Sequence, residues 1–157
     1  MPARKHTYFL GRIHINTAAN DPKQLLLDSL NSTATETIGR FKYGFFEIQE
    51  FGEGHDRYIY GKLVKYKAIL VSEIANEAER RIDETGTPEG IVAKSDFCIN
   101  YRSLIIAYRP ISTRLGPNQF RRAFCRLIEA ANDRFFVSAS IETIQEEYTI
   151  EEALQSF

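Results

Sequence analysis

The alternation of apolar and polar residues divides the chain into short strands and a few amphipathic helices. Segments rich in β-branched and aromatic residues that alternate with a period of two are typical of strands. Such segments lie at 7–15, 41–51, 58–66, 91–101, 104–108 and 135–144. The second and third of these flank a glycine-containing stretch, 52–56, and this arrangement predicts a β-hairpin.

The clearest predicted helix covers residues 117–132. Its apolar residues recur along one face of a 3.6-residue repeat, which predicts burial against a sheet; they are Phe120, Phe124, Leu127, Ile128 and Ala131. A shorter helix is predicted to begin at Pro22 with Asp21 as its N-cap. We further expect a loop over 31–39, a strand at 68–71 followed by a helix at 76–81, and the start of a last helix at 149–152.

Strands joined by short connections, with only occasional helices between them, favour the α+β class. We expect a mainly antiparallel sheet with helices on one face and a ferredoxin-like second half. The length fits a single domain over 1–157, with 1–86 and 91–157 as alternative subdomains. Because the last predicted helix has barely begun at Phe157, we expect the chain to be the N-terminal part of a longer protein.

Composition excludes several classes of protein. Hydrophobic residues make up 43% and charged residues 26% of the chain, as in ordinary globular proteins. No apolar run approaches the roughly 18–20 residues of a membrane-spanning helix. Cys98 and Cys125 stand apart and lack metal-ligand spacing, so we expect two buried thiols, with a disulfide as the alternative. The sequence therefore predicts a cytoplasmic protein that needs no membrane, cofactor or metal.

Positive charge is concentrated in one part of a nearly neutral chain. The net charge is −1, yet seven arginines and no lysine lie between Arg102 and Arg134, with only two acids, Glu129 and Asp133. Arginine favours planar, bidentate recognition of phosphate or carboxylate. The alternative is a solvated helix face with weak ion pairs. The candidate nucleic-acid-binding residues are Arg109 and Arg114 before the helix, Arg122 and Arg126 opposite its apolar face, and Arg121 at its flank.

Two other groups of residues offer weaker hypotheses. The hairpin mixes cations with aromatic side chains, which could stack nucleic-acid bases on an exposed sheet face or could simply be core. His14 and His55 are candidates for acid–base chemistry or, equally, for a half-buried histidine and a turn residue. No nucleophile–base set or phosphate-binding loop is recognisable, so we name no catalytic residue.

The second half resembles a known pattern. Residues 95–100 and 105–108, an amphipathic helix, and then 137–144 and 150–154 follow one another in an order that is similar to bacterial anti-phage defence proteins. These are the second component of the Kiwa system and related uncharacterised families. The resemblance implies a role in host defence with nucleic-acid contact, and it transfers no catalytic residue.

We therefore expect a non-catalytic recognition or assembly domain of a bacterial defence protein. It would contact RNA, DNA or a partner subunit through the arginine-rich region. One alternative is an RNA-processing or nuclease enzyme on a ferredoxin-like scaffold, with His14 or His55 as acid or base. Another is a homo-oligomerisation domain built on the tyrosine-rich hairpin.

Overall fold

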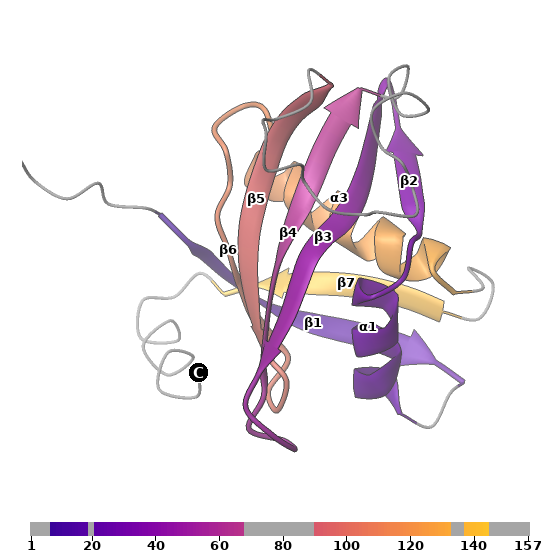
Figure 1. Cartoon of the computed structure of the whole chain (residues 1–157), viewed down its shortest axis with the longest axis vertical. Helices are drawn as coiled ribbons and strands as arrows, with labels where there is room; N and C mark the ends of the chain where they lie inside the picture. Colours follow the sequence, from indigo (N-terminus) through magenta and orange to yellow (C-terminus); the bar gives the residue numbers. More distant parts are fainter. Residues whose placement is uncertain (1–6, 19–20, 68–89, 133–136, 145–157) are drawn as a thin grey trace, which may run out of the picture.

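The computed structural model describes residues 7–18, 21–67, 90–132 and 137–144 (Figure 1). These residues form one seven-stranded antiparallel sheet in the order β2-β3-β4-β5-β6-β1-β7. The strands are β1 (Phe9–Thr17), β2 (Thr35–Ile38), β3 (Phe41–Phe51), β4 (Tyr58–Lys67), β5 (Ile91–Asn100), β6 (Ile105–Tyr108) and β7 (Val137–Thr143). The described helices are α1 (Pro22–Leu30) and α3 (Pro117–Ala130). The predicted α+β class with a mainly antiparallel sheet is confirmed.

The sheet curls around α3, which crosses behind β3 and β4 and lies next to β7 (Figure 1). The helix contacts both edge strands of the sheet, β2 and β7. Glu129 Oε2 accepts a hydrogen bond from the backbone N–H of Ala139 in β7, at 3.1 Å. Covering a strand edge with a helix satisfies backbone groups that would otherwise invite pairing with another chain.

The core lies between α3 and the concave face of the sheet. Phe120, Phe124, Leu127 and Ile128 are fully buried, as their spacing predicts. The rings of Phe120 and Phe124 pack against aromatic residues of the sheet. The ring centroids of Phe124 and Phe45 are 5.1 Å apart, and Phe120 stacks on Tyr108 with centroids 4.3 Å apart. Leucines of α1 join the same core, so both described helices pack into one core.

Local signals located most of the elements. The backbone N–H of Gln24 donates to Asp21 Oδ1 at 3.1 Å, which confirms the predicted N-cap of α1. The hairpin of β3 and β4 is confirmed, with a β-bulge where Glu47 has a φ of 53° and the register shifts between Phe46 and Gln49. The bulge adds one residue to β3 and was not evident from the alternation of side chains.

The prediction of a loop over 31–39 was wrong, because residues 35–38 form β2. This strand pairs with the start of β3, with Thr35 opposite Gly44 and Ile38 opposite Phe41. A four-residue strand carries too few alternating positions to be recognised. It is stabilised by its hydrogen bonds to β3, and that pairing is not visible in the local sequence. Tertiary pairing therefore overrode the local turn-like composition.

A ferredoxin-like second half is not confirmed. β1 lies between β6 and β7, so the strands of the second half are interrupted by the first strand of the chain. The sheet also continues from β4 directly to β5, across the point where two subdomains would be divided. The strand expected at 68–71 and the helices expected at 76–81 and 149–152 lie outside the described residues.

Candidate functional site

The fold divides the arginine-rich stretch between two ends of the sheet. Arg102 lies in the turn that joins β5 to β6, whereas Arg109 and Arg114 lie in the loop that leads from β6 to α3. Because β5 and β6 are antiparallel neighbours, that turn and that loop lie at opposite ends of the pair. Arg134 is outside the described residues.

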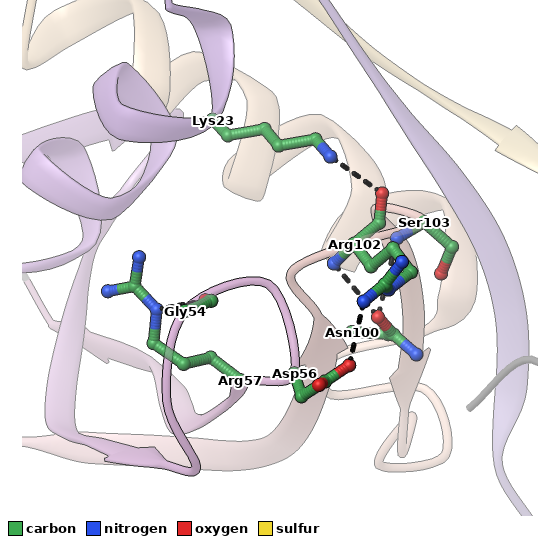
Figure 2. A network of polar contacts seen from close by, with 7 residues as sticks. All are labelled: Lys23, Gly54, Asp56, Arg57, Asn100, Arg102 and Ser103. Carbon is green, nitrogen blue, oxygen red and sulfur yellow. Dashed lines mark hydrogen bonds and ion pairs between the residues drawn. The ribbon is translucent and has the colours of Figure 1, made fainter.

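Arg102 belongs to a polar network at the hairpin end of the sheet (Figure 2). Its Nη2 lies 2.9 Å from Asp56 Oδ1, and its carbonyl oxygen accepts a hydrogen bond from Lys23 Nζ at 2.7 Å. The Arg57 guanidinium donates to Gly54 O at 2.7 Å and stacks 4.3 Å from the centre of the Tyr101 ring. These contacts join α1, the β3–β4 turn and the β5–β6 turn, so the cations here serve the fold.

Arg109 is also used within the protein. Its Nη1 lies 3.9 Å from Asp96 Oδ2, and its backbone N–H donates to Asp96 O at 3.0 Å. Its carbonyl oxygen accepts a short hydrogen bond of 2.6 Å from the hydroxyl of Ser95, which is fully buried. Arg109 therefore fixes the start of the β6–α3 loop, and a carboxylate already balances its charge.

Arg121 satisfies a buried hydroxyl. Its Nη1 donates to Tyr108 Oη at 2.8 Å, and its Nη2 donates to the side chain of Asn118. Burial raises the pKa of Tyr108, and the nearby Arg121 guanidinium acts in the opposite direction. The flanking position predicted for Arg121 is confirmed by its half-buried side chain.

The remaining three arginines, Arg114, Arg122 and Arg126, form what we call the arginine face. Arg114 and Arg122 are exposed, the latter as the helix phase predicts. Arg126, predicted on the same side as Arg122, is half-buried. In the described part of the chain, no carboxylate is ion-paired with any of them. Glu129, three residues after Arg126, accepts a hydrogen bond from the Ala139 N–H at the edge of β7. Asp133 is outside the described residues.

Two buried side chains hold the loop that carries Arg114. Lys65 Nζ donates to Arg114 O at 2.5 Å, and Ser95 holds Arg109 O as described above. Backbone hydrogen bonds between Ile111 and Leu115, of 2.9 and 3.2 Å, close the loop on itself. Sequence reasoning missed Lys65 and Ser95. The available signal was the alternation of inward and outward residues along each strand. Both Lys65 and Ser95 occupy positions on the same sheet face as buried apolar neighbours.

The two histidines lie in different parts of the molecule. His14 Nε2 is 2.9 Å from Glu142 Oε2 on the neighbouring strand, and both side chains are largely exposed. Ser140 lies directly opposite His14 in the register, but no hydrogen bond joins their side chains. His55 is exposed in the β3–β4 turn, 6.4 Å from the Tyr101 ring. For the enzyme alternative, His14 and Glu142 therefore form an exposed base–acid pair, but no described nucleophile is hydrogen-bonded to His14.

The hairpin tyrosines divide between the two sheet faces. Tyr43 is buried in the core beneath α3, whereas Tyr58, Tyr60 and Tyr66 alternate with the inward residues of β4. Of these three, Tyr66 is buried in a second cluster with Phe46 and Val64, and Tyr58 and Tyr60 are half-buried. Only the latter pair would be available for stacking on bases. Burial and the adjacent Asp96 both raise the pKa of Tyr60, to which Asp96 is hydrogen-bonded.

Both cysteines are free thiols and are half-buried, so the disulfide alternative is not seen. Burial raises the pKa of Cys98 and raises that of Cys125 to about 12. Among the residues that the structure describes, no three His, Cys, Asp or Glu side chains are grouped as metal ligands. No helix in those same ranges is long and apolar enough to span a bilayer.

We compared the chain with protein-family models, with curated proteins and with solved structures. None of the three comparisons found a match. The resemblance to defence proteins therefore stays an expectation, and the geometry of the arginine face is the basis for a functional proposal.

Proposed function

We propose that this chain is a non-catalytic recognition domain that binds the phosphate backbone of RNA or DNA through the arginine face. One observation carries the proposal: the arginine face has no ion-paired carboxylate in the described part of the chain, whereas Arg57, Arg102 and Arg109 each have one. Guanidinium groups that no described carboxylate neutralises can bind external anions.

The spacing of the arginine face suits a polyanion. Arg122 and Arg126 are four residues apart on α3, so their Cα atoms are separated by about 6 Å along the helix axis. Arg114 lies in the loop that leads into the same helix. Three guanidinium groups on a rigid helix and a fixed loop can contact neighbouring phosphates of one strand. Such contacts position a nucleic acid without reading its bases.

Recognition without cleavage fits the side chains at hand, because no described nucleophile is bonded to the exposed His14. We expect the isolated chain to cleave neither RNA nor DNA, with or without divalent metal. Cleavage that is lost in His14→Ala or His55→Ala would favour the enzyme alternative. The role in anti-phage defence is part of the proposal and is tested by expressing the chain in its native genetic context during phage challenge.

The test of binding combines Arg122→Glu with Arg126→Glu. We expect the double variant to lose at least about tenfold in affinity for a fluorescent single-stranded oligonucleotide, measured by anisotropy, because two phosphate contacts become repulsive. The matched control is Arg12→Glu with Lys94→Glu, which changes the net charge equally on the face away from α3. Binding of the wild type should also weaken steeply with salt, because phosphate contacts release counter-ions.

Three results would contradict the proposal. The wild type could show no binding, its binding could be independent of salt, or the control could lose as much affinity as the arginine-face variant. In the last case net charge alone would explain the association.

A further inference from the structure

Phe9 is one of three large apolar side chains that are exposed in the described part of the chain, with 36% of its surface open to solvent. It is also the outer end of a series of ring contacts. The ring centroids of Phe124 and Phe120 are 5.8 Å apart, and Phe120 stacks on Tyr108 at 4.3 Å with the ring planes 6° apart. The Tyr108 ring in turn contacts Phe9, with centroids 6.0 Å and planes 37° apart. The aromatic core therefore reaches the surface at Phe9.

The sheet fixes the position of Phe9. Phe9 is the direct partner of Tyr108 in the antiparallel register of β1 and β6, and Tyr108 is fully buried. On the other side of β1, the register with β7 begins only at Gly11, so no described strand pairs with Phe9 there. An exposed ring that is held by a strand can bind a planar group with little loss of conformational entropy.

A cation lies beside the same tyrosine. Arg121 Nη1 donates to Tyr108 Oη at 2.8 Å, and its Nη2 donates to the side chain of Asn118. A guanidinium group has five N–H donors, so these two hydrogen bonds leave others for an external acceptor. Among the residues described, no carboxylate is ion-paired with Arg121. Phe9 and Arg121 thus contact one tyrosine, Phe9 at its ring and Arg121 at its hydroxyl.

These two groups match the two parts of a nucleotide. Aromatic rings stack on bases of single strands, and guanidinium groups bind phosphate. Arg121 directly precedes Arg122 of the arginine face, and successive residues of a helix differ in direction by about 100°. A strand bound at Arg122 would therefore pass around α3 to reach Arg121 and Phe9.

We propose that Phe9 stacks on an unpaired base of the bound strand, while Arg121 contacts the adjoining phosphate. This inference rests on the proposed function and specifies that the nucleic acid is single-stranded. In a duplex each base is already stacked between its neighbours, so its faces are not available to an external ring. A strand with unpaired bases is the ligand that uses both groups.

The experiment uses the full chain and compares a labelled single strand with an abasic strand of the same length, which keeps the phosphates and lacks the bases. By anisotropy, the wild type should bind the base-bearing strand at least about fivefold more tightly, the lower end of the effect of stacking one base. Phe9→Leu keeps an apolar side chain without a ring. It should bring the two affinities to within about twofold of each other and leave the abasic strand bound as before.

Two variants serve as controls. Phe9→Tyr retains a ring and should keep the preference for the base-bearing strand. Phe51→Leu removes an exposed ring from β3, which is separated from β1 by three strands of the sheet, and it should also keep the preference. Arg121→Gln should weaken both strands, because the phosphate contact is common to them; unchanged affinities would overturn the part of the proposal that concerns Arg121.

The chain contains no tryptophan, so Phe9→Trp places a single indole at the site. A base that stacks on an indole quenches its fluorescence. We expect the base-bearing strand to quench Phe9→Trp and the abasic strand to leave it unchanged, whereas Phe51→Trp should respond to neither. This measurement keeps the proposal falsifiable even if Phe9→Leu fails to fold.

Several results would overturn the stacking site. They are equal affinity of the wild type for the two strands, an unchanged preference in Phe9→Leu, and equal loss of both affinities in that variant, which would indicate a purely structural role. Equal quenching in Phe9→Trp and Phe51→Trp would overturn it as well. Failure of the proposed function is distinct, because Arg122→Glu with Arg126→Glu would then bind the abasic strand as the wild type does, while the preference for bases would remain.

Discussion

Phe124 is the residue whose truncation should most damage the fold. Its side chain is fully buried at the centre of the aromatic core. The ring packs edge-on against Phe45 at 5.1 Å and Phe97 at 5.6 Å, and it lies 5.8 Å from Phe120 on the preceding turn of α3. Phe124→Ala removes all three ring contacts and leaves a cavity that the surrounding strands and helix cannot fill without moving.

The magnitude follows from the buried surface. A buried phenylalanine removes roughly 150–250 Å² from water, and at about 25 cal/mol per Å² this amounts to about 4–6 kcal/mol. Alanine retains a part of that burial, so the expected loss is about 3–5 kcal/mol. Because the unfolding free energy of a domain is typically about 5–15 kcal/mol, the variant should be marginally stable.

Urea denaturation followed by far-ultraviolet circular dichroism measures this loss directly, and the absence of tryptophan makes fluorescence the weaker probe. With a slope of about 2 kcal/mol per M, the midpoint should fall by about 1.5–2.5 M. Phe51→Ala is the matched control, because Phe51 is 56% exposed; its cost should stay below about 1 kcal/mol. Equal midpoints for wild type and Phe124→Ala would refute the helix phase and with it the placement of the arginine face.

Two further predictions concern stability. The pKa of Cys125 is raised from 9.0 to about 12, so as pH rises the unfolded state loses this proton first and stability falls between those values. Cys125→Ala should show a smaller decrease than the wild type in thermal melts at increasing pH, and parallel curves would contradict the assignment. A Cβ at residue 61 would lie 2.9 Å from Phe97 Cζ and still closer to Ile48 Cδ1; Gly61→Ala should therefore cost about 1–3 kcal/mol in urea, and an unchanged midpoint would show that β3 and β5 adjust freely.

Local periodicity is sufficient to predict the elements whose determinants lie within a few residues of one another. The apolar stripe of α3 predicts its buried face because residues three and four apart share one side of any helix. Asp21 and Pro22 predict the start of α1 because capping involves only the first turn. Alternation in β4 and β5 similarly assigns their inward residues.

Contacts between distant segments decided the parts that the sequence alone could not predict. β2 pairs with the start of β3, and β1 lies between β6 and β7, far from both along the chain. The position of β7 beside α3 lets Glu129 accept from the Ala139 N–H, and no ion pair joins it to Arg126 among the described residues.

The candidate site shows the same division. Seven arginines in one stretch of sequence predict a cationic surface, but strand β6 carries Arg102 and Arg114 to opposite ends of the sheet. Lys65 is far from Arg114 along the chain, and only the packing of the loop on β4 brings its ammonium group to the Arg114 carbonyl. Charge and periodicity are properties of neighbouring residues, whereas burial and ion pairing depend on which remote segments meet when the sheet curls around the helix.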